Sequence, residues 1–164
     1  PRIAGASGLW RAGGVNLALL SFYDAFDVPV EICLNNVDVV MDAALEHRYR
    51  HDIQYTDVYI DMDDTILMGE KINPLVMAFL YQCWNRRVKI HILTRGMKWA
   101  SMSVFIIWDD LITIEEGESK ADKILVKKSI FIDDSFAERL DVYRRLNIPV
   151  FAPDAIEALM DWRY

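Results

Sequence analysis

The sequence has few cysteines, no long apolar run and no excess of positive charge. Its two cysteines, Cys33 and Cys83, lack the spacing of a metal or redox site, so we expect a reduced, cytoplasmic protein. The apolar runs at 75–80 and 104–108 are far shorter than the ~20 residues that span a membrane, so no membrane contact is expected. With 25 Asp and Glu against 18 Lys and Arg, the net charge is −7, which argues against a nucleic-acid partner.

The beginning of the chain lacks two further features. No basic segment followed by an apolar one opens it, so secretion is not expected. The first residue is Pro1 rather than Met, so we expect a fragment or a processed chain. The length of 164 residues, 53% of them apolar, suits about one domain with a sizeable core.

The pattern of the chain changes near residue 50. Four of the seven glycines lie within 1–14, and a helix at 15–26, a strand at 30–34 and a helix at 37–50 are predicted after them. Farther along, short apolar runs alternate with amphipathic stretches. Strands are predicted at 57–61, 88–93, 111–114, 129–132 and 150–151, and helices at 74–86, 97–108, 119–127, 135–146 and 153–162.

This alternation predicts an α/β fold. Strands that alternate with helices form a parallel sheet, and strands that are apolar throughout are typical of a sheet covered on both faces. We therefore expect a three-layer, Rossmann-like sheet with helices on both sides.

Polar residues follow three of the predicted strands. Asp61 comes after Val-Tyr-Ile, Thr94 after Ile-His-Ile-Leu, and Asp133-Asp134 after Ile-Phe-Ile. Parallel strands point in one direction, so these ends should meet at the carboxyl edge of the sheet, where ligands of open α/β sheets bind. The intervals of 33 and 39 residues leave room for the crossover helices that this convergence needs.

The residue types that should converge indicate phosphoryl transfer. Clustered carboxylates repel one another and need a cation, and oxygen ligands favour a hard ion such as Mg²⁺. A hydroxyl and a lysine beside them suit an anionic substrate, and a carboxylate can serve as the nucleophile. The three histidines show no metal spacing, and His91, inside a predicted strand, is interpreted as structural.

Four motifs resemble those of the haloacid-dehalogenase (HAD) superfamily of phosphatases. Residues 61–67 (Asp-Met-Asp-Asp-Thr-Ile-Leu) resemble its first motif, Thr94 the second, Lys120 the third and Asp133-Asp134 the fourth. They occur in the family's order across about residues 55–164.

The resemblance implies a role for each catalytic residue. Asp61 would attack phosphorus and carry an aspartyl-phosphate, while Asp63 would protonate the leaving oxygen and then activate water. Thr94 would donate a hydrogen bond to the phosphoryl group, and Lys120 would neutralise its charge. Because Asp63 is present, hydrolysis of a phosphate ester is favoured over dehalogenation.

The same resemblance implies a Mg²⁺ site. Asp133 would hold the ion together with Asp61 and with a backbone carbonyl at Asp63. Asp134 would either bind the ion too or steady its neighbour.

Three assignments at this site stay open. Lys123 competes with Lys120 as the phosphate-binding lysine, and Lys120 is favoured because it starts the predicted helix nearer the catalytic edge. Thr65 is a candidate for substrate binding, although orienting Asp63 is the favoured interpretation. Arg95 lies in a site loop and is a candidate for touching substrate, with a solvated arginine as the alternative.

The short intervals between motifs predict a phosphatase domain without a cap. Positions 66–93 and 95–119 each have room for only a helix and a strand. A capless site at 51–164 would admit a phosphorylated small molecule or a larger phosphorylated substrate.

The first 50 residues suggest a different origin. The segment PRIAGASGLWRAGGVN resembles the closing part of an ATP-grasp domain of the carbamoyl-phosphate-synthase-like kind, so we expect residues 1–50 to be a remnant or tail of one. It is not a phosphate-binding P-loop, because Gly14 stands where that motif needs Lys. The alternative function is therefore a catalytically silent HAD-fold module, interacting with or regulating an ATP-grasp ligase. Self-association into a homo-oligomer is left open by the apolar surface that such a tail would expose.

Overall fold

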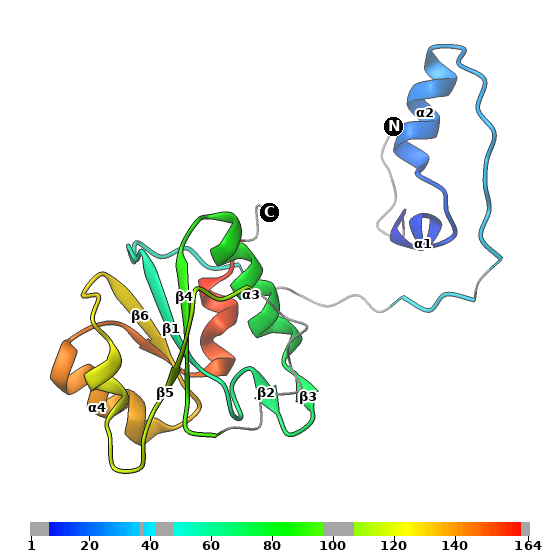
Figure 1. Ribbon diagram of the computed structural model, residues 1–164. Coiled ribbons are helices and arrows are strands. Elements are labelled where there is room, and N and C mark those ends of the chain that lie inside the picture. Colours follow the sequence, from blue (N-terminus) through cyan, green and yellow to red (C-terminus); the bar gives the residue numbers. More distant parts are fainter. Residues whose placement is uncertain (1–6, 37, 42–47, 97–106, 162–164) are drawn as a thin grey trace. The chain divides into compact units, whose positions relative to one another are not determined.

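The chain forms two units in the computed structural model, Pro1–Glu46 and His47–Tyr164 (Figure 1). The structure describes residues 7–36, 38–41, 48–96 and 107–161. Within these residues, none of the helices combines the length and the apolar character needed to cross a membrane.

The first unit contains two short helices, α1 (Ser7–Ala12) and α2 (Leu17–Ala25). The α2 helix was predicted at 15–26, and it begins where the Asn16 side chain accepts a hydrogen bond from the Leu19 backbone N–H at 3.2 Å. The α1 helix was not predicted, because glycines surround it. Among the side chains described in this unit, Val15 alone is buried.

Two predictions for residues 30–50 are wrong where the structure describes the chain. Residues 30–34 form no strand, because the described residues offer no partner strand with which they could form a ladder. Residues 38–41 and 48–50 are not helical, which contradicts both ends of the helix predicted at 37–50. The middle of that prediction, at 42–47, lies outside the described residues.

The second unit contains a five-stranded sheet in which every neighbouring pair is parallel. Its order is β5-β4-β1-β6-β7. The strands are β1 (Asp57–Asp61), β4 (Lys89–Thr94), β5 (Asp110–Thr113), β6 (Ser129–Ile132) and β7 (Val150–Phe151). The predicted α/β class and all five predicted strands are confirmed, with ends that differ by one residue at β4 and β5.

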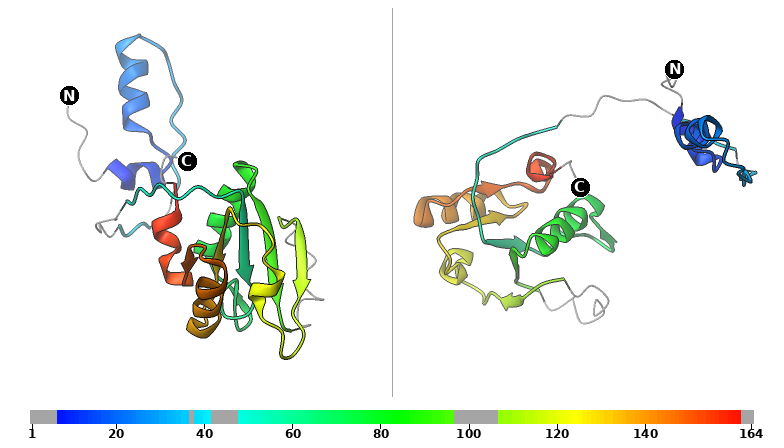
Figure 2. Two further views of the ribbon diagram at one scale, coloured as in Figure 1. Left: turned by 90° about the vertical axis from the view of Figure 1, so that its left-hand side faces the viewer. Right: turned by 90° about the horizontal axis from the view of Figure 1, so that it is seen from above.

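Helices cover both faces of this sheet, which gives three layers (Figures 1 and 2). On one face α3 (Pro74–Asn85) and the 3₁₀ helix η3 (Pro153–Leu159) pack on alternate strand residues such as Ile60. On the other face the 3₁₀ helix η2 (Lys120–Lys123) and α4 (Phe136–Leu146) pack on residues of opposite parity, such as Phe131. Two apolar cores on opposite faces explain why the strands are apolar throughout.

A short hairpin and two 3₁₀ helices differ from the prediction. The hairpin of β2 (Leu67–Met68) and β3 (Lys71–Ile72) was not foreseen, because strands of two residues leave no periodic pattern. The helices predicted at 119–127 and 153–162 are instead the short η2 and η3. The helix predicted at 97–108 falls mostly outside the described residues, and its last two positions are not helical.

A buried histidine links three strands near their amino ends. His91 of β4 contacts Asp57 of β1 through Nε2 and Asp110 of β5 through Nδ1, each at 2.8 Å from a carboxylate oxygen. The ring also stacks on Tyr59, with centroids 4.4 Å apart. The structural interpretation of His91 agrees with these contacts.

Candidate active site

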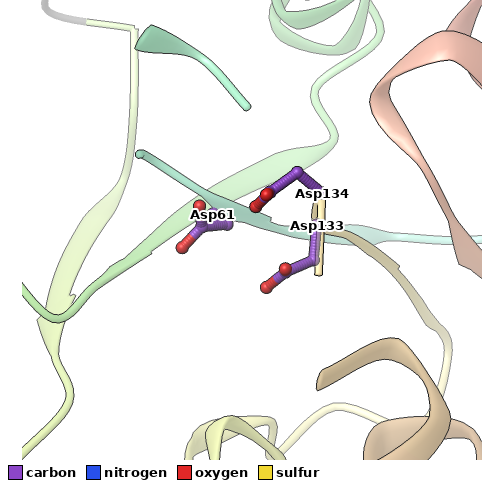
Figure 3. Close-up of side chains that lie close together, drawn as sticks. All are labelled: Asp61, Asp133 and Asp134. Atoms are coloured by element: carbon purple, nitrogen blue, oxygen red, sulfur yellow. The ribbon is translucent and has the colours of Figure 1, made fainter. Parts of the chain in front are cut away.

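Three carboxylates lie together at the carboxyl edge of the sheet. Asp61 ends β1, and Asp133 and Asp134 directly follow the neighbouring β6. One oxygen of each lies within 4.8 Å of the others, and the three side chains point toward a common space (Figure 3). Because β1 and β6 are parallel neighbours, their ends bring these residues together although 72 positions separate Asp61 from Asp133.

Lys120 is buried between two of these carboxylates. Its Nζ donates to Oδ1 of Asp61 at 2.5 Å and to Oδ2 of Asp133 at 2.6 Å. The Ser119 side chain accepts from the Ala121 backbone N–H and so starts the η2 turn that directs Lys120 inward. Lys123, the competing lysine, is instead partly exposed and pairs with Glu118 at 2.8 Å.

Burial dominates the protonation of this cluster. It raises the pKa of Asp61 to about 7, against the opposing effect of Lys120, and the Asp133 and Asp134 charges add to the rise. Burial also raises the pKa of Asp133, again against Lys120. For Lys120, burial alone would lower the pKa, but the two carboxylates outweigh it and the pKa is raised. The lysine therefore stays charged.

Asp63 lies at the exposed rim of the cluster. The Thr94 hydroxyl lies 3.5 Å from Oδ2 of Asp63 and 3.1 Å from the Gly96 carbonyl oxygen. A Cβ added to Gly96 would lie 3.3 Å from the same Asp63 oxygen, so this position has little room for a side chain. Between Asp63 and the hairpin the chain turns sharply, with Asp64 in the left-handed region at φ 56°.

Thr65 contacts the backbone of the acidic loop, which is the segment Asp133–Asp134 after β6. It is fully buried, and its hydroxyl accepts a hydrogen bond from the Asp134 backbone N–H at 3.1 Å. The described contact of this hydroxyl is thus to the backbone of Asp134, and the expected roles of Thr65 toward substrate and toward Asp63 stay predictions.

Arg95 connects three parts of the fold. Its guanidinium donates to the backbone carbonyls of Glu115 and Glu118 at 3.1 and 2.7 Å, and to the Glu138 carboxylate at 2.9 Å. The side chain thus ties the end of β4 to the loop before Lys120 and to α4. Its contact with substrate stays a prediction.

Two backbone contacts at the acidic loop were not foreseen. The Ser135 N–H donates to Oδ1 of Asp133 at 2.8 Å, and the guanidinium of Arg139 donates to the carbonyls of Asp133 and Asp134. The sequence holds a weak signal for the second contact, an arginine one turn into a helix that begins beside an acidic pair.

The charges of the cluster suit a divalent cation. Three carboxylates face one ammonium group, so two negative charges remain uncompensated when all three acids are ionised. The donors are all oxygens, which favour hard ions such as Mg²⁺. The residues present therefore fit a bound Mg²⁺.

The segment between the first two motifs folds as the β2–β3 hairpin, α3 and β4. No cap domain is inserted between Thr65 and Thr94, all of which the structure describes.

The chain matches no protein-family model, and no curated protein matches it. Two solved structures are similar in fold. One is the N-terminal part of BF1531 from Bacteroides fragilis, "containing phosphatase domain complexed with Mg", with 16% identity over 66% of this chain and a TM-score of 0.49. The other is an uncharacterized protein from Corynebacterium glutamicum, with 13% identity over 59% of this chain, 83% of that chain and a TM-score of 0.48. The matched region spans 39% of the Bacteroides structure, and similarity at this level assigns no activity.

Proposed function

We propose that the chain is a Mg²⁺-dependent phosphatase of the HAD type, which hydrolyses a phosphate monoester through an aspartyl-phosphate. The observation that carries the proposal is the buried Lys120 ammonium between Asp61 and Asp133, with Asp134 beside them at the same sheet edge. Burying a cation among several carboxylates is costly for folding alone, and such arrangements cluster at functional sites.

The residues would divide the reaction into two steps. In the first, an Asp61 oxygen forms a bond to phosphorus while the ester P–O bond breaks, and Asp63 gives its proton to the leaving oxygen. In the second, Asp63 takes a proton from water, the water oxygen bonds to phosphorus, and the Asp61–phosphorus bond breaks to release phosphate. Thr94 and Lys120 would stabilise the negative charge of the transferring group.

Asp61, Asp133 and Asp134 would hold the Mg²⁺, which would neutralise negative charge and polarise a phosphoryl oxygen. Burial raises the pKa of Asp61 and so disfavours the ionised form that a nucleophile needs, whereas a bound cation would favour that form. Lys120 keeps one Asp61 oxygen hydrogen-bonded and thereby orients the carboxylate.

Hydrolysis of p-nitrophenyl phosphate tests the proposal. We expect activity with Mg²⁺, loss of activity with EDTA, and loss in Asp61→Asn, which keeps the side-chain shape but removes the nucleophile. A parent chain no more active than Asp61→Asn, across aryl phosphates and a panel of phosphorylated metabolites, contradicts the proposal.

A trapping experiment tests the covalent step separately. Nitrophenolate leaves readily without a proton, so Asp63→Asn should slow the second step more than the first. Mass spectrometry of acid-quenched Asp63→Asn should then find a phosphoryl group on Asp61. Its absence in Asp63→Asn during turnover would argue against the aspartyl-phosphate.

The alternative function is a catalytically silent HAD-fold module that interacts with or regulates an ATP-grasp ligase, and the surface of the first unit supports it. Trp10, Phe22, Phe26 and Leu34 are among many large apolar side chains that are exposed there. A folded chain that binds no Mg²⁺ by calorimetry would favour this alternative. Light scattering of the purified chain would then separate self-association from a need for a different partner.

A further inference from the structure

Arg139 reaches back from α4 to the backbone of the two acidic residues. Its Nη1 donates to the carbonyl oxygen of Asp133 at 2.5 Å and to that of Asp134 at 2.7 Å. The side chain is partly buried, and its guanidinium lies 5.9 Å from the centroid of the Phe136 ring.

These carbonyls lie where the sheet no longer pairs them. The Asp133 N–H still donates to the Phe151 carbonyl at 3.1 Å, but β6 ends at Ile132. A backbone carbonyl beyond a strand needs another donor when it is partly buried, as at Asp133, and the Arg139 guanidinium supplies it while also bonding to the more exposed Asp134 carbonyl. The opposite side of the segment is held by the Thr65 hydroxyl, which accepts from the Asp134 N–H.

The acidic loop is therefore hydrogen-bonded by residues of two different parts of the fold. Thr65 belongs to the loop after β1, and Asp61 is the last residue of β1 itself. Arg139 belongs to the first turns of α4. Rotation of either peptide plane would turn the Asp133 or Asp134 carboxylate away from Asp61, and the Arg139 bonds oppose that rotation.

We propose that Arg139 is a positioning residue, which fixes the Asp133–Asp134 and Asp134–Ser135 peptide planes so that both carboxylates face the cation site. The inference rests on the proposed function for the identity of the ion. Arg139 contacts carbonyl oxygens rather than carboxylates, so it touches neither substrate nor the reacting atoms.

The charge and the hydrogen bonds of Arg139 predict opposite effects on cation binding. If its positive charge alone mattered, removing it would reduce repulsion and tighten Mg²⁺ binding. If its hydrogen bonds hold the ligands in place, removing them weakens binding, as loss of groups that orient metal ligands does. The sign of the change therefore identifies the role.

The test is calorimetric titration of Mg²⁺ into the full chain and its variants, without substrate. We expect Arg139→Met to bind Mg²⁺ about 10-fold to 100-fold more weakly than the parent. Arg139→Lys keeps the charge, but its nitrogen ends one bond short of the Nη1 atom that donates to both carbonyls, so this variant should also bind more weakly than the parent. Arg144→Met removes an exposed arginine from the last turn of the same helix and should leave Mg²⁺ affinity unchanged.

Amide exchange supplies a readout that needs no metal. The Asp134 N–H donates to Thr65 and the Ser135 N–H to Asp133, so both should exchange faster in Arg139→Met than in Arg144→Met, with EDTA present. A general loss of stability would raise amide exchange throughout α4 and the sheet. A positioning role predicts faster exchange only at Asp134 and Ser135.

Parent-like or tighter Mg²⁺ binding by Arg139→Met overturns the inference and leaves the phosphatase proposal standing. Should that variant fail to fold, the same comparison with Arg139→Lys decides. A parent that binds Mg²⁺ but hydrolyses no phosphate refutes the proposed function alone, and the inference is then judged on Mg²⁺ affinity. A parent that binds no Mg²⁺ overturns both.

Discussion

Replacing Lys120 by methionine removes the positive charge at the centre of the cluster while keeping much of its volume. Two carboxylates then lose their partner, Asp61 with 7% of its side chain exposed and Asp133 with 0%. At an effective dielectric constant of about 20, two unit charges about 4 Å apart attract by ~4 kcal/mol. Breaking a buried ion pair by removing one partner costs about 3–5 kcal/mol, and we expect a loss in that range for Lys120→Met.

Mg²⁺ should reverse much of this loss. The uncompensated charge of the cluster rises from two to three when Lys120 is removed, so the variant should bind Mg²⁺ at least ~10-fold more tightly than the parent. Excess Mg²⁺ at ~100 times its Kd stabilises the folded state by about 2.7 kcal/mol. Hydrolysis should nevertheless fall about 100-fold to 1000-fold, because the cation of Lys120 no longer stabilises the transferring group.

Urea unfolding with EDTA and with Mg²⁺, together with calorimetry, measures both effects. Lys123→Met is the matched control, since its ion pair with Glu118 is partly exposed and contributes less than about 1 kcal/mol. The reasoning fails if Lys120→Met matches the parent in stability and Mg²⁺ affinity, or if Lys123→Met has the larger effect.

Three further predictions concern pH, the sheet and the rim of the site. The folded-state pKa of Asp61, about 7, lies above its usual 3.8, so its stability contribution is present at low pH and lost as pH rises through about 7. Without metal, the free energy of unfolding measured in urea should fall by up to about 4 kcal/mol as pH rises through this range. The fall should be absent in Asp61→Asn and offset by Mg²⁺. His91→Phe leaves the buried Asp57 carboxylate without its imidazole partner and should lower the free energy of thermal unfolding by about 3 kcal/mol or more. Asp110→Asn is the control, because 59% of the Asp110 side chain is exposed, and it should lower that free energy by less than about 1 kcal/mol. Gly96→Ala places a methyl group 3.3 Å from Oδ2 of Asp63 and should lower kcat by about 10-fold to 100-fold at nearly unchanged stability; unchanged steady-state kinetics would show that Asp63 moves freely.

Much of the second unit was predictable because both faces of its sheet are covered. The middle of each central strand is then mostly apolar, and runs such as Val58–Ile60 and Ile130–Ile132 stand out from the amphipathic helices. The polar residue that ends each run marks the carboxyl edge, which is why Asp61, Thr94 and Asp133 could be expected to converge.

The features that escaped prediction depend on backbone geometry rather than on residue patterns. Arg139 and Thr65 bind peptide groups whose positions only the folded loop defines, so the place of Arg139 one turn into α4 is at most a weak signal. The strand expected at 30–34 has a suitable apolar alternation, but a strand also needs a neighbour, and the described residues supply none.

The contacts of His91 near the amino ends of the strands fix the register of β4 against β1 and β5. If β4 slipped by one residue, His91 would leave Asp57 and Asp110 and enter the apolar layer occupied by Ile90 and Ile92. A charged or polar ring buried there without partners is strongly disfavoured, so one alignment is selected. That alignment also sets Thr94 level with Thr113 at the far end, so the geometry of the carboxyl edge depends on contacts several residues away.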